Sequence, residues 1–399
     1  MGSANSHNVL VIGNKPPYPS IDGGCFAMGK FEQLLRPLVS KFIYFAIETP
    51  KHPFKAAALP LYWKLNENFF THFIDTAINS KHVAKYLEGS SIRAARFYTK
   101  ATEIKLLELI GKYQIDTVIF ESVYSAVYLK GIKKKTNARC YIRTHNIEYQ
   151  IWEKHYEDMS KGLKKIAFKN ETERLRKFEV QCLSHSDGNI FISEKDELYS
   201  RKNITAKRSA TVPVQIEITG SSESKSKGAL KLFHIGAMDW KPNIEGVKRF
   251  LEEIYPTLQN KFPGLELHLA GKSMPDEFNK YASQNVTIHG EVKDADEFIK
   301  SYDVSIVPLL SGSGIRIKIL EAMAHGKPVI TTAAGIHGIP ATAGENYLQA
   351  GTMEDWIAAI RKLNDPDFYK TISGNGINFI RENYSVSILQ PILTEFINQ

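Results

Sequence analysis

Two cations and a carboxylate follow a Gly/Ser-rich loop in SGSGIRIKILEAMA, residues 311–324. A glycine such as Gly314 lets the backbone approach a ligand closely, and the start of the following helix offers unpaired N–H groups. Arg316 adds a guanidinium that suits a phosphate, and Lys318 adds a second cation. Glu321 lies one turn further on, where a carboxylate could accept from both hydroxyls of a ribose. This spacing indicates a site for a nucleoside diphosphate. The alternative is a Lys–Glu pair on the surface of an amphipathic helix.

A histidine and two glutamates follow other apolar runs. His145 comes directly after ARCYIRT, Glu148 follows it by three residues, and Glu121 ends the run DTVIFE. Ligands of open α/β sheets collect at the carboxyl ends of the strands, so these positions are candidates for chemistry. A single histidine in such a place is more often structural than functional, and the spacing by itself does not decide between the two.

Short β-rich runs alternate with helical patterns along the whole chain. They include NVLVIG, KFIYFAI and GNIFIS in the first half, and ALKLFHIG, LELHLAG, NVTIHG, DVSIVPL and KPVITT in the second. The pattern predicts an α/β protein with two doubly wound parallel sheets. A Ser/Lys/Gly-rich stretch at 219–228 is typical of an exposed linker. We therefore expect one domain at 1–211, a second at 212–378, and a helical segment at 379–399 that packs back across the joint.

Charge is distributed unevenly between the two halves. Residues 1–211 carry 33 Lys and Arg against 21 Asp and Glu, whereas residues 212–399 carry 18 against 22. A basic half suits an anionic membrane surface, a phosphate-bearing substrate or nucleic acid, and the alternative is an ordinary solvated surface. No recognition motif of a known nucleic-acid module is present, so nucleic acid is not an expected partner.

The cellular location is predicted from the apolar runs and the cysteines. No apolar run approaches the roughly 18 residues of a membrane-spanning helix. The N-terminal sequence MGSANSHNVLVIG has no secretory pattern, and its first six residues read as an addition to the natural sequence. The three cysteines are widely spaced, without a CxxC motif, which argues against a disulfide framework or a thiolate zinc site. A cytoplasmic protein is expected.

The stretch GSGIRIKILEAMAHGKPVITTAAGIHGI (312–339) resembles the signature of family 4 glycosyltransferases. That family has the GT-B fold of two facing Rossmann-like domains with a cleft between them. FHIGAMDWKPNIEGVKRFLEEIYP (233–256) is similar to the first strand, loop and helix of its donor domain, and NVLVIGNKPPYPSIDGGCFAMGKF (8–31) to its N-terminal Gly-rich loop. The donor-binding residues that the resemblance implies are Gly23, Gly24, Gly236, Lys241, Asn243, Gly314, Arg316, Lys318 and Glu321.

The chain departs from the common family pattern at three positions. Ser313 stands where many relatives have a second glutamate, which leaves that contact to the donor sugar open. Ala237 and Pro242 stand where relatives carry an Arg and a Lys on the diphosphate. Arg316 and Lys318 are therefore expected to neutralise most of the phosphate charge.

The resemblance also implies an activity. It is the transfer of a sugar from a UDP- or GDP-sugar to a saccharide or lipid-linked acceptor, with retention at the anomeric carbon, in surface polysaccharide or glycoconjugate synthesis. In this interpretation Arg316 and Lys318 stabilise the leaving diphosphate, His145 acts at the transferred sugar, and Glu148 and Glu121 lie on the acceptor side. No cofactor is expected, since the nucleotide-sugar is a substrate.

No metal is expected either. The other large glycosyltransferase fold holds manganese with an Asp-x-Asp motif, and Asp294 and Asp296 form such a triplet here. The triplet lies between a strand pattern and a helix pattern, where an aspartate is a favourable N-cap. We therefore interpret it as a helix start.

Two segments of the basic half are candidates for contact with a membrane or an acceptor. KGLKKIAFKNETERLRKFEVQCLSHSD (161–187) reads as a cationic amphipathic helix, and FKAAALPLYWKLNENFF (54–70) is rich in aromatic residues. Peripheral binding to the cytoplasmic face of an anionic membrane is the resulting hypothesis. The alternatives to a glycosyltransferase are a sugar-nucleotide epimerase of the same fold and a non-catalytic relative that binds anionic surfaces. The identities of the sugar and the acceptor, and the oligomeric state, are not encoded in a readable motif.

Overall fold

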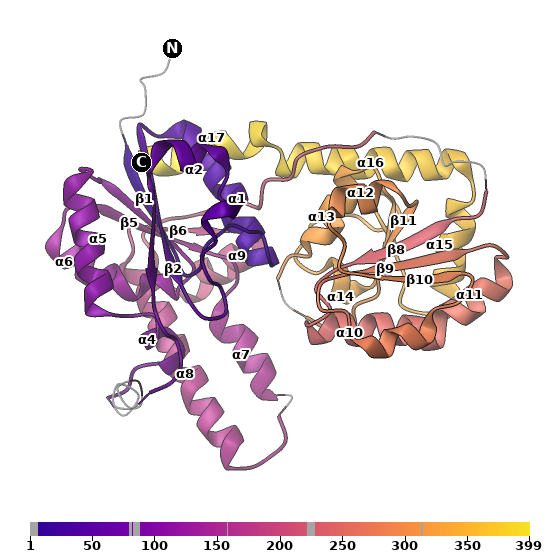
Figure 1. Cartoon of the computed structure of the whole chain (residues 1–399), viewed down its shortest axis with the longest axis horizontal. Helices are drawn as coiled ribbons and strands as arrows, with labels where there is room; N and C mark the ends of the chain where they lie inside the picture. Colours follow the sequence, from indigo (N-terminus) through magenta and orange to yellow (C-terminus); the bar gives the residue numbers. More distant parts are fainter. Residues whose placement is uncertain (1–6, 80–81, 83–87, 158, 222–227, 313) are drawn as a thin grey trace. The chain divides into compact units, whose positions relative to one another are not determined.

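The chain folds into two α/β units, each built on one parallel sheet (Figure 1). Unit 1 comprises Met1–Gln215 and Leu389–Gln399, and unit 2 comprises Ile216–Ile388. The predicted α/β class with two parallel sheets is confirmed. The computed structural model describes residues 7–79, 82, 88–157, 159–221, 228–312 and 314–399. The N-terminal six residues, most of the predicted linker and Ser313 lie outside these ranges.

The sheet of unit 1 has seven strands in the order β3-β2-β1-β4-β5-β6-β7, and every neighbouring pair is parallel. Its central strands are runs of β-branched and aromatic residues that are buried on both faces, because helices cover both sides of the sheet. The strands are β1 (Asn8–Gly13), β2 (Lys41–Glu48), β3 (Phe69–Phe73), β4 (Thr117–Glu121), β5 (Arg139–Thr144), β6 (Gly188–Phe191) and β7 (Ser209–Thr211).

Helices connect the strands of unit 1. They are α1 (Gly23–Leu35), η1 (Arg36–Leu38), η2 (Ala56–Ala58), α2 (Leu61–Asn66), α4 (Ile92–Ala95), α5 (Lys100–Lys112), η3 (Ser125–Tyr128), α6 (Leu129–Lys135), α7 (Glu148–Glu157), α8 (Leu163–His185) and α9 (Glu194–Asn203). Between β5 and β6, α7 and α8 run side by side and project from the sheet as an arm (Figure 1).

The sheet of unit 2 has six strands in the order β10-β9-β8-β11-β12-β13, again all parallel. The strands are β8 (Lys231–Ile235), β9 (Glu266–Ala270), β10 (Val286–Gly290), β11 (Val304–Val307), β12 (Val329–Thr331) and β13 (Leu348–Gln349). The helices are α10 (Lys241–Arg249), η4 (Phe250–Ile254), α11 (Tyr255–Lys261), η5 (Asp276–Tyr281), α12 (Ala295–Lys300), α13 (Ile317–Ala324), α14 (Ala333–Ile336), α15 (Met353–Leu363) and α16 (Pro366–Tyr384).

The C-terminal segment divides between the two units. Helix α16 ends at Tyr384 and packs within unit 2, where its contacts include α13. After Ser385 the chain starts a second helix, α17 (Val386–Asn398), whose buried Leu389, Leu393 and Phe396 join the core formed around β1 and β2. Unit 2 ends at Ile388 in the first turn of α17, and the rest of this helix, from Leu389, belongs to unit 1.

Three short edge strands were missed by the sequence reading: β3, β7 and β13. An edge strand is covered less completely than a central one, so its sequence carries no continuous apolar run.

Strand β3 also changes the interpretation of segment 54–70. There Trp63 is buried in the core and Phe69 stacks on Tyr44 at 5.2 Å, whereas Leu61 and Leu65 on α2 are 69% and 72% exposed. No helix within the described part of the chain is long and apolar enough to cross a membrane.

Candidate functional site

In unit 2 the predicted phosphate loop follows strand β11. Gly312 and Gly314 have φ angles of 132° and 79°. Residues other than glycine rarely adopt such angles, so this backbone conformation requires both glycines. Arg316 occupies the N-cap position of α13, one residue before the helix. Its Nη1 donates to the Gly314 carbonyl at 2.8 Å, and its guanidinium lies 5.0 Å from the Trp240 ring. Trp240 thus packs against the cation of the loop.

The side chain of Lys318, in the first turn of α13, extends toward the end of β8. Its Nζ donates to Asn243 Oδ1 at 2.9 Å and lies 3.4 Å from His234 Nε2. Asn243 in turn donates to the Ala237 carbonyl at 2.7 Å. A Cβ added at Gly236 would overlap the Lys318 ammonium, so glycine is required there for this close approach. The structure therefore brings Gly236, Asn243 and Lys318 together.

The protonation states of this group follow from burial. His234 Nδ1 lies 2.8 Å from the Ile306 carbonyl, which can only accept, so Nδ1 carries the proton and Nε2 presents a lone pair to Lys318. Burial and the adjacent lysine hold the pKa of His234 well below its usual range. Burial, assisted by Arg316, lowers the pKa of Lys318 to about 7. Burial also lowers the pKa of Arg316 to about 10.

Two other predicted donor residues lie differently. The side chain of Lys241 is 82% exposed and pairs with Glu245 at 3.3 Å, so it does not join the group around Lys318. Its position at the start of α10 explains this, because the residue that turns inward from that turn is Asn243. Glu321 is partly buried on α13, one turn after Lys318. His325, at the end of α13, forms hydrogen bonds with Thr219 and Asp296 instead.

The DAD triplet begins a helix, as predicted. Asp294 accepts from the Glu297 backbone N–H at 3.0 Å and caps α12. Asp296 Oδ1 lies 2.9 Å from His325 Nε2. These two carboxylates thus have structural partners on α12 and α13.

In unit 1 the carboxyl ends of β4 and β5 carry a buried polar cluster. Arg143 Nη1 donates to both oxygens of Glu121 at 3.1 and 2.9 Å, and both side chains are fully buried. His145 Nε2 lies 2.9 Å from Glu121 Oε2. Arg143 and His145 hold the pKa of Glu121 below its usual value despite burial, and burial lowers the pKa of His145. The structure therefore brings the predicted His145 and Glu121 into direct contact, and Arg143 contacts both.

Sequence reasoning missed both Arg143 and His234. Each interrupts an otherwise apolar strand, in ARCYIRT and KLFHIG. A charged or imidazole side chain in a strand buried on both faces needs a polar partner, and that requirement is the signal that could have found them.

Glu148 belongs to a different group, at the start of α7. It accepts from the Tyr124 hydroxyl at 3.1 Å, and its backbone N–H donates to Glu179 at 2.9 Å. Glu179 also accepts from the Tyr149 N–H, so this carboxylate on α8 caps α7. Burial raises the pKa of Glu148 to about 7 and, together with Glu148, that of Glu179 to about 8.

Gly23 and Gly24, expected in a Gly-rich loop, form the first turn of α1. Asp22 caps this helix through the Cys25 N–H at 2.8 Å and binds Lys15 Nζ at 2.6 and 2.8 Å. A Cβ at Gly24 would lie 2.7 Å from that ammonium.

The same turn holds a group of metal-ligand residue types. Asp22, Cys25 and His52 have ligand atoms within 4.8 Å of one another, a grouping found among the described residues. The carboxylate is already paired with Lys15, and burial raises the pKa of Cys25 to about 11, which opposes formation of a thiolate. The donor set fits a metal poorly.

Two parallel sheets with a glycine loop and cations at the carboxyl end of a strand are typical of nucleotide-binding α/β proteins. Residues 229–365 match the family model described as glycosyl transferases group 1. A Klebsiella pneumoniae protein named "Uncharacterized 44.6 kDa protein in cps region" is 24% identical over 310 residues, which is 74% of this chain and 77% of that one.

Solved structures agree over nearly the whole chain. Sucrose-phosphate synthase from Thermosynechococcus elongatus has a TM-score of 0.68 at 15% identity, covering 98% of this chain and 99% of that one. HepE of Anabaena, solved in complex with UDP-glucose, has a TM-score of 0.66 at 12% identity and covers 98% and 100%. The chain therefore has the two-domain GT-B fold of these structures, and its residues 229–365 are similar to group 1 glycosyl transferases.

Proposed function

We propose that this enzyme transfers a sugar from a UDP- or GDP-sugar to a saccharide or lipid-linked acceptor. In the proposal, unit 2 binds the donor and unit 1 the acceptor, and the reaction follows the family 4 pattern of retention without a metal or a cofactor. The Klebsiella relative is named for a cps region, which supports a role in surface polysaccharide or glycoconjugate synthesis.

One observation carries the donor assignment. Lys318 is held against the Gly236 backbone by His234 and Asn243, at the carboxyl end of β8 and beside the loop that carries Arg316. Among the contacts described, neither an aspartate nor a glutamate lies within ion-pair distance of the Lys318 ammonium. A cation placed in this way is suited to an incoming anion, and the glycine loop gives a diphosphate access to backbone N–H groups.

The proposed chemistry is the departure of the nucleoside diphosphate from the anomeric carbon. Negative charge develops on the leaving phosphate oxygen, and Arg316 and Lys318 stabilise it. For a retaining reaction, the acceptor hydroxyl attacks from the face that the diphosphate leaves, and the departing oxygen takes the acceptor proton. Glu321 is proposed to hold the ribose hydroxyls.

On the acceptor side, Glu121 fixes the orientation of His145. Nε2 of His145 lies 2.9 Å from Glu121 Oε2 and 3.1 Å from Arg143 Nη1; in the proposal its proton points to the carboxylate, which Arg143 keeps ionised, and Nδ1 keeps the lone pair. His145 is thereby neutral and able to accept a hydrogen bond from a sugar hydroxyl. Glu148 follows His145 by three residues and is also proposed to bind the acceptor. Its pKa of about 7 leaves it partly protonated.

Membrane contact is proposed at the end of the α7–α8 arm. Leu163 and Ile166 are 86% and 59% exposed at the start of α8, and Lys161 and Lys164 are exposed beside them. Exposed apolar residues among lysines suit an anionic lipid surface. The remainder of α8 buries Leu175 and Leu183 against unit 1, so the predicted amphipathic helix is cationic and apolar at the surface only in its first turns.

The membrane proposal is tested by sedimentation with vesicles at low salt. The wild type should bind phosphatidylglycerol-containing vesicles better than phosphatidylcholine vesicles, and Leu163→Ser with Ile166→Ser should weaken that binding. Leu198→Ser is the matched control, since Leu198 is 59% exposed on α9. Equal sedimentation of all three proteins would refute membrane contact through the arm.

The donor site is tested by thermal-shift titration with UDP, GDP and ADP on the wild type and on Glu321→Ala. Stabilisation by one nucleotide that weakens in the variant is the expected result, because a ligand that binds only the folded state raises the melting temperature. If no nucleotide stabilises the wild type, the donor assignment is wrong.

A further inference from the structure

A polar pocket lies in unit 1 at the amino ends of the strands, whereas His145 lies at their carboxyl ends. It has a volume of about 440 Å³. Arg139 begins β5, Asp187 directly precedes β6, and Lys207 and Arg208 directly precede β7, so the pocket gathers residues from the amino ends of three neighbouring strands. The lining residues are Arg139, Tyr141, Asp187, Lys207, Arg208 and Gln399.

This pocket is separate from the cluster that contains His145 and Glu121. Strand β5 runs from Arg139 to Thr144, and His145 follows its last residue. At about 3.3 Å per residue, the two ends of this strand are roughly 16 Å apart. A ligand at the amino end therefore does not occupy the site proposed for the acceptor.

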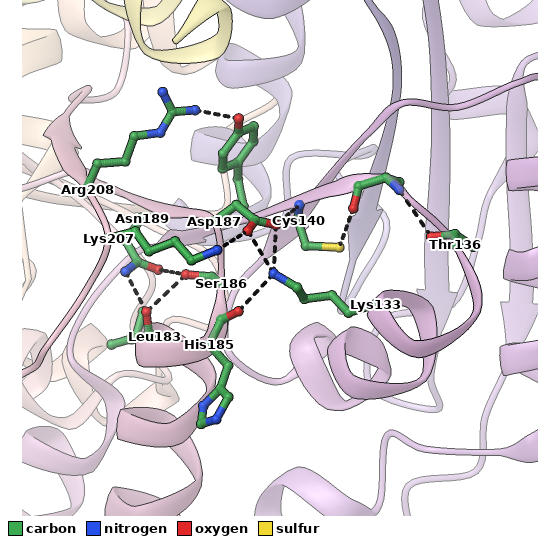
Figure 2. A network of polar contacts seen from close by, with 12 residues as sticks. Lys133, Thr136, Cys140, Leu183, His185, Ser186, Asp187, Asn189, Lys207 and Arg208 are labelled. Carbon is green, nitrogen blue, oxygen red and sulfur yellow. Dashed lines mark hydrogen bonds and ion pairs between the residues drawn. The ribbon is translucent and has the colours of Figure 1, made fainter.

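The only acidic side chain among the lining residues is already neutralised. Lys133 Nζ lies 2.8 Å from each oxygen of Asp187, Lys207 Nζ lies 2.6 Å from Oδ1, and the Cys140 N–H donates to Oδ2 at 2.9 Å (Figure 2). The two lysines lower the pKa of Asp187 to about 2, so this carboxylate stays ionised and bound to them. It does not balance the charge of the two arginines.

Arg208 is fixed in place but not paired with a carboxylate. Its Nη2 donates to the Tyr141 hydroxyl, and its guanidinium lies 5.0 Å from the Tyr141 ring and 4.6 Å from the Phe396 ring. Gly188 makes room for it, because a Cβ there would lie 2.8 Å from Arg208 Cγ. An aromatic support and a glycine thus hold the guanidinium while its other N–H groups remain available to a ligand.

Arg139 shows the same lack of an acidic partner. Its Nη2 lies 3.3 Å from His7 Nδ1, and this nitrogen lies 3.3 Å from Asp116 Oδ1. Within the ranges that the structure describes, neither Arg139 nor Arg208 forms a direct ion pair with a carboxylate, whereas Arg143 and Arg201 each do. Two guanidinium groups without a direct carboxylate partner therefore line one pocket.

We propose that this pocket binds a ligand that carries a phosphate group. Arginine forks match the oxygens of a phosphate, and the pocket is open to solvent, which gives such a group access to both arginines. Lys207 adds a nearby positive charge, and the Tyr141 hydroxyl adds a donor. The ligand is a soluble phosphate ester or the phosphate headgroup of a lipid, which share this chemistry.

The test is calorimetric titration with inorganic pyrophosphate. Wild type and the double variant Arg139→Gln with Arg208→Gln are compared with Lys318→Gln, which alters the proposed donor site, and with Lys130→Gln, which removes one exposed charge from α6. We expect the two arginine substitutions to weaken pyrophosphate binding at this site by about tenfold or more, since each removes charge-assisted hydrogen bonds. The binding event lost in the arginine variant should persist in Lys318→Gln and in Lys130→Gln.

Unchanged affinity and stoichiometry in the arginine variant would overturn the proposal. Because Arg208 also packs against aromatic rings, Arg139→Glu serves as a second variant that leaves this packing intact. It should weaken binding further than Arg139→Gln through repulsion of the anion, and an equal effect of the two substitutions would contradict a direct phosphate contact.

Vesicle sedimentation then separates the two sources of phosphate. If the ligand is a lipid headgroup, Arg139→Gln with Arg208→Gln reduces binding to phosphatidic acid vesicles while Leu163→Ser with Ile166→Ser leaves a phosphatidic acid preference. If the ligand is soluble, the arginine variant loses pyrophosphate binding and keeps wild-type binding to vesicles.

Discussion

The titration of Lys318 predicts that donor binding weakens steeply above neutral pH. Burial and the neighbouring Arg316 lower the pKa of Lys318 to about 7 in the free enzyme, whereas a diphosphate attracts only the ammonium form. The protonated fraction falls from about one half at pH 7 to about one hundredth at pH 9. The dissociation constant of UDP should therefore rise about 50-fold over this interval, if the bound diphosphate keeps Lys318 protonated.

Calorimetric titration with UDP measures this effect directly. In buffers of different ionisation enthalpy, the wild type should take up about half a proton on binding at pH 7 and close to one at pH 8. Lys318→Arg is the matched control, because a guanidinium stays charged throughout this range. Any titration of UDP itself appears equally in both proteins. A pH profile that is flat in the wild type, or identical in Lys318→Arg, would refute the role of Lys318.

The other predictions concern single sites in each unit. Gly236→Ala places a Cβ on the Lys318 ammonium and should weaken UDP binding at least tenfold, about the loss of one charge-assisted contact, whereas Gly111→Ala fills open space and should bind normally. Arg143→Gln leaves its buried carboxylate partner without a cation and should lower the free energy of unfolding in urea by about 3–5 kcal/mol; a loss below 1 kcal/mol would contradict the pairing. The raised pKa of Glu148, about 7, means that the folded state holds a proton that the unfolded state releases above pH 5, so this group's stabilisation is lost as pH rises through 7. Urea unfolding at pH 6 and pH 8.5 should show that loss in the wild type and a smaller one in Glu148→Gln.

The central strands and the phosphate loop were predictable from local sequence. Runs such as NVLVIG and DVSIVPL are apolar because both faces of a central strand are covered, and the glycines at 312 and 314 are required by their own backbone angles. The start of α12 at Asp294 was likewise readable, because an N-cap acts on a backbone group three residues away. Each of these signals depends on neighbours in the sequence.

The partners of the candidate residues were not predictable in this way. Lys241 and Lys318 are both lysines near the start of a helix, yet one lies in solvent and the other against Gly236. His234 and Asn243 decide that difference, and they come from positions 84 and 75 residues before Lys318. Spacing along the chain contains no information on such contacts.

The sequence by itself determined the two parallel sheets, the glycine loop and the residue types that suit a nucleoside diphosphate. Only the tertiary structure decided that Arg143 contacts both Glu121 and His145, that burial lowers the pKa of Lys318 to about 7, and that two arginines line one pocket at the amino ends of β5 and β7. The physical reason is that periodicity and backbone conformation are local properties. Burial, charge compensation and the shape of a cavity arise only where strands distant in the sequence lie side by side.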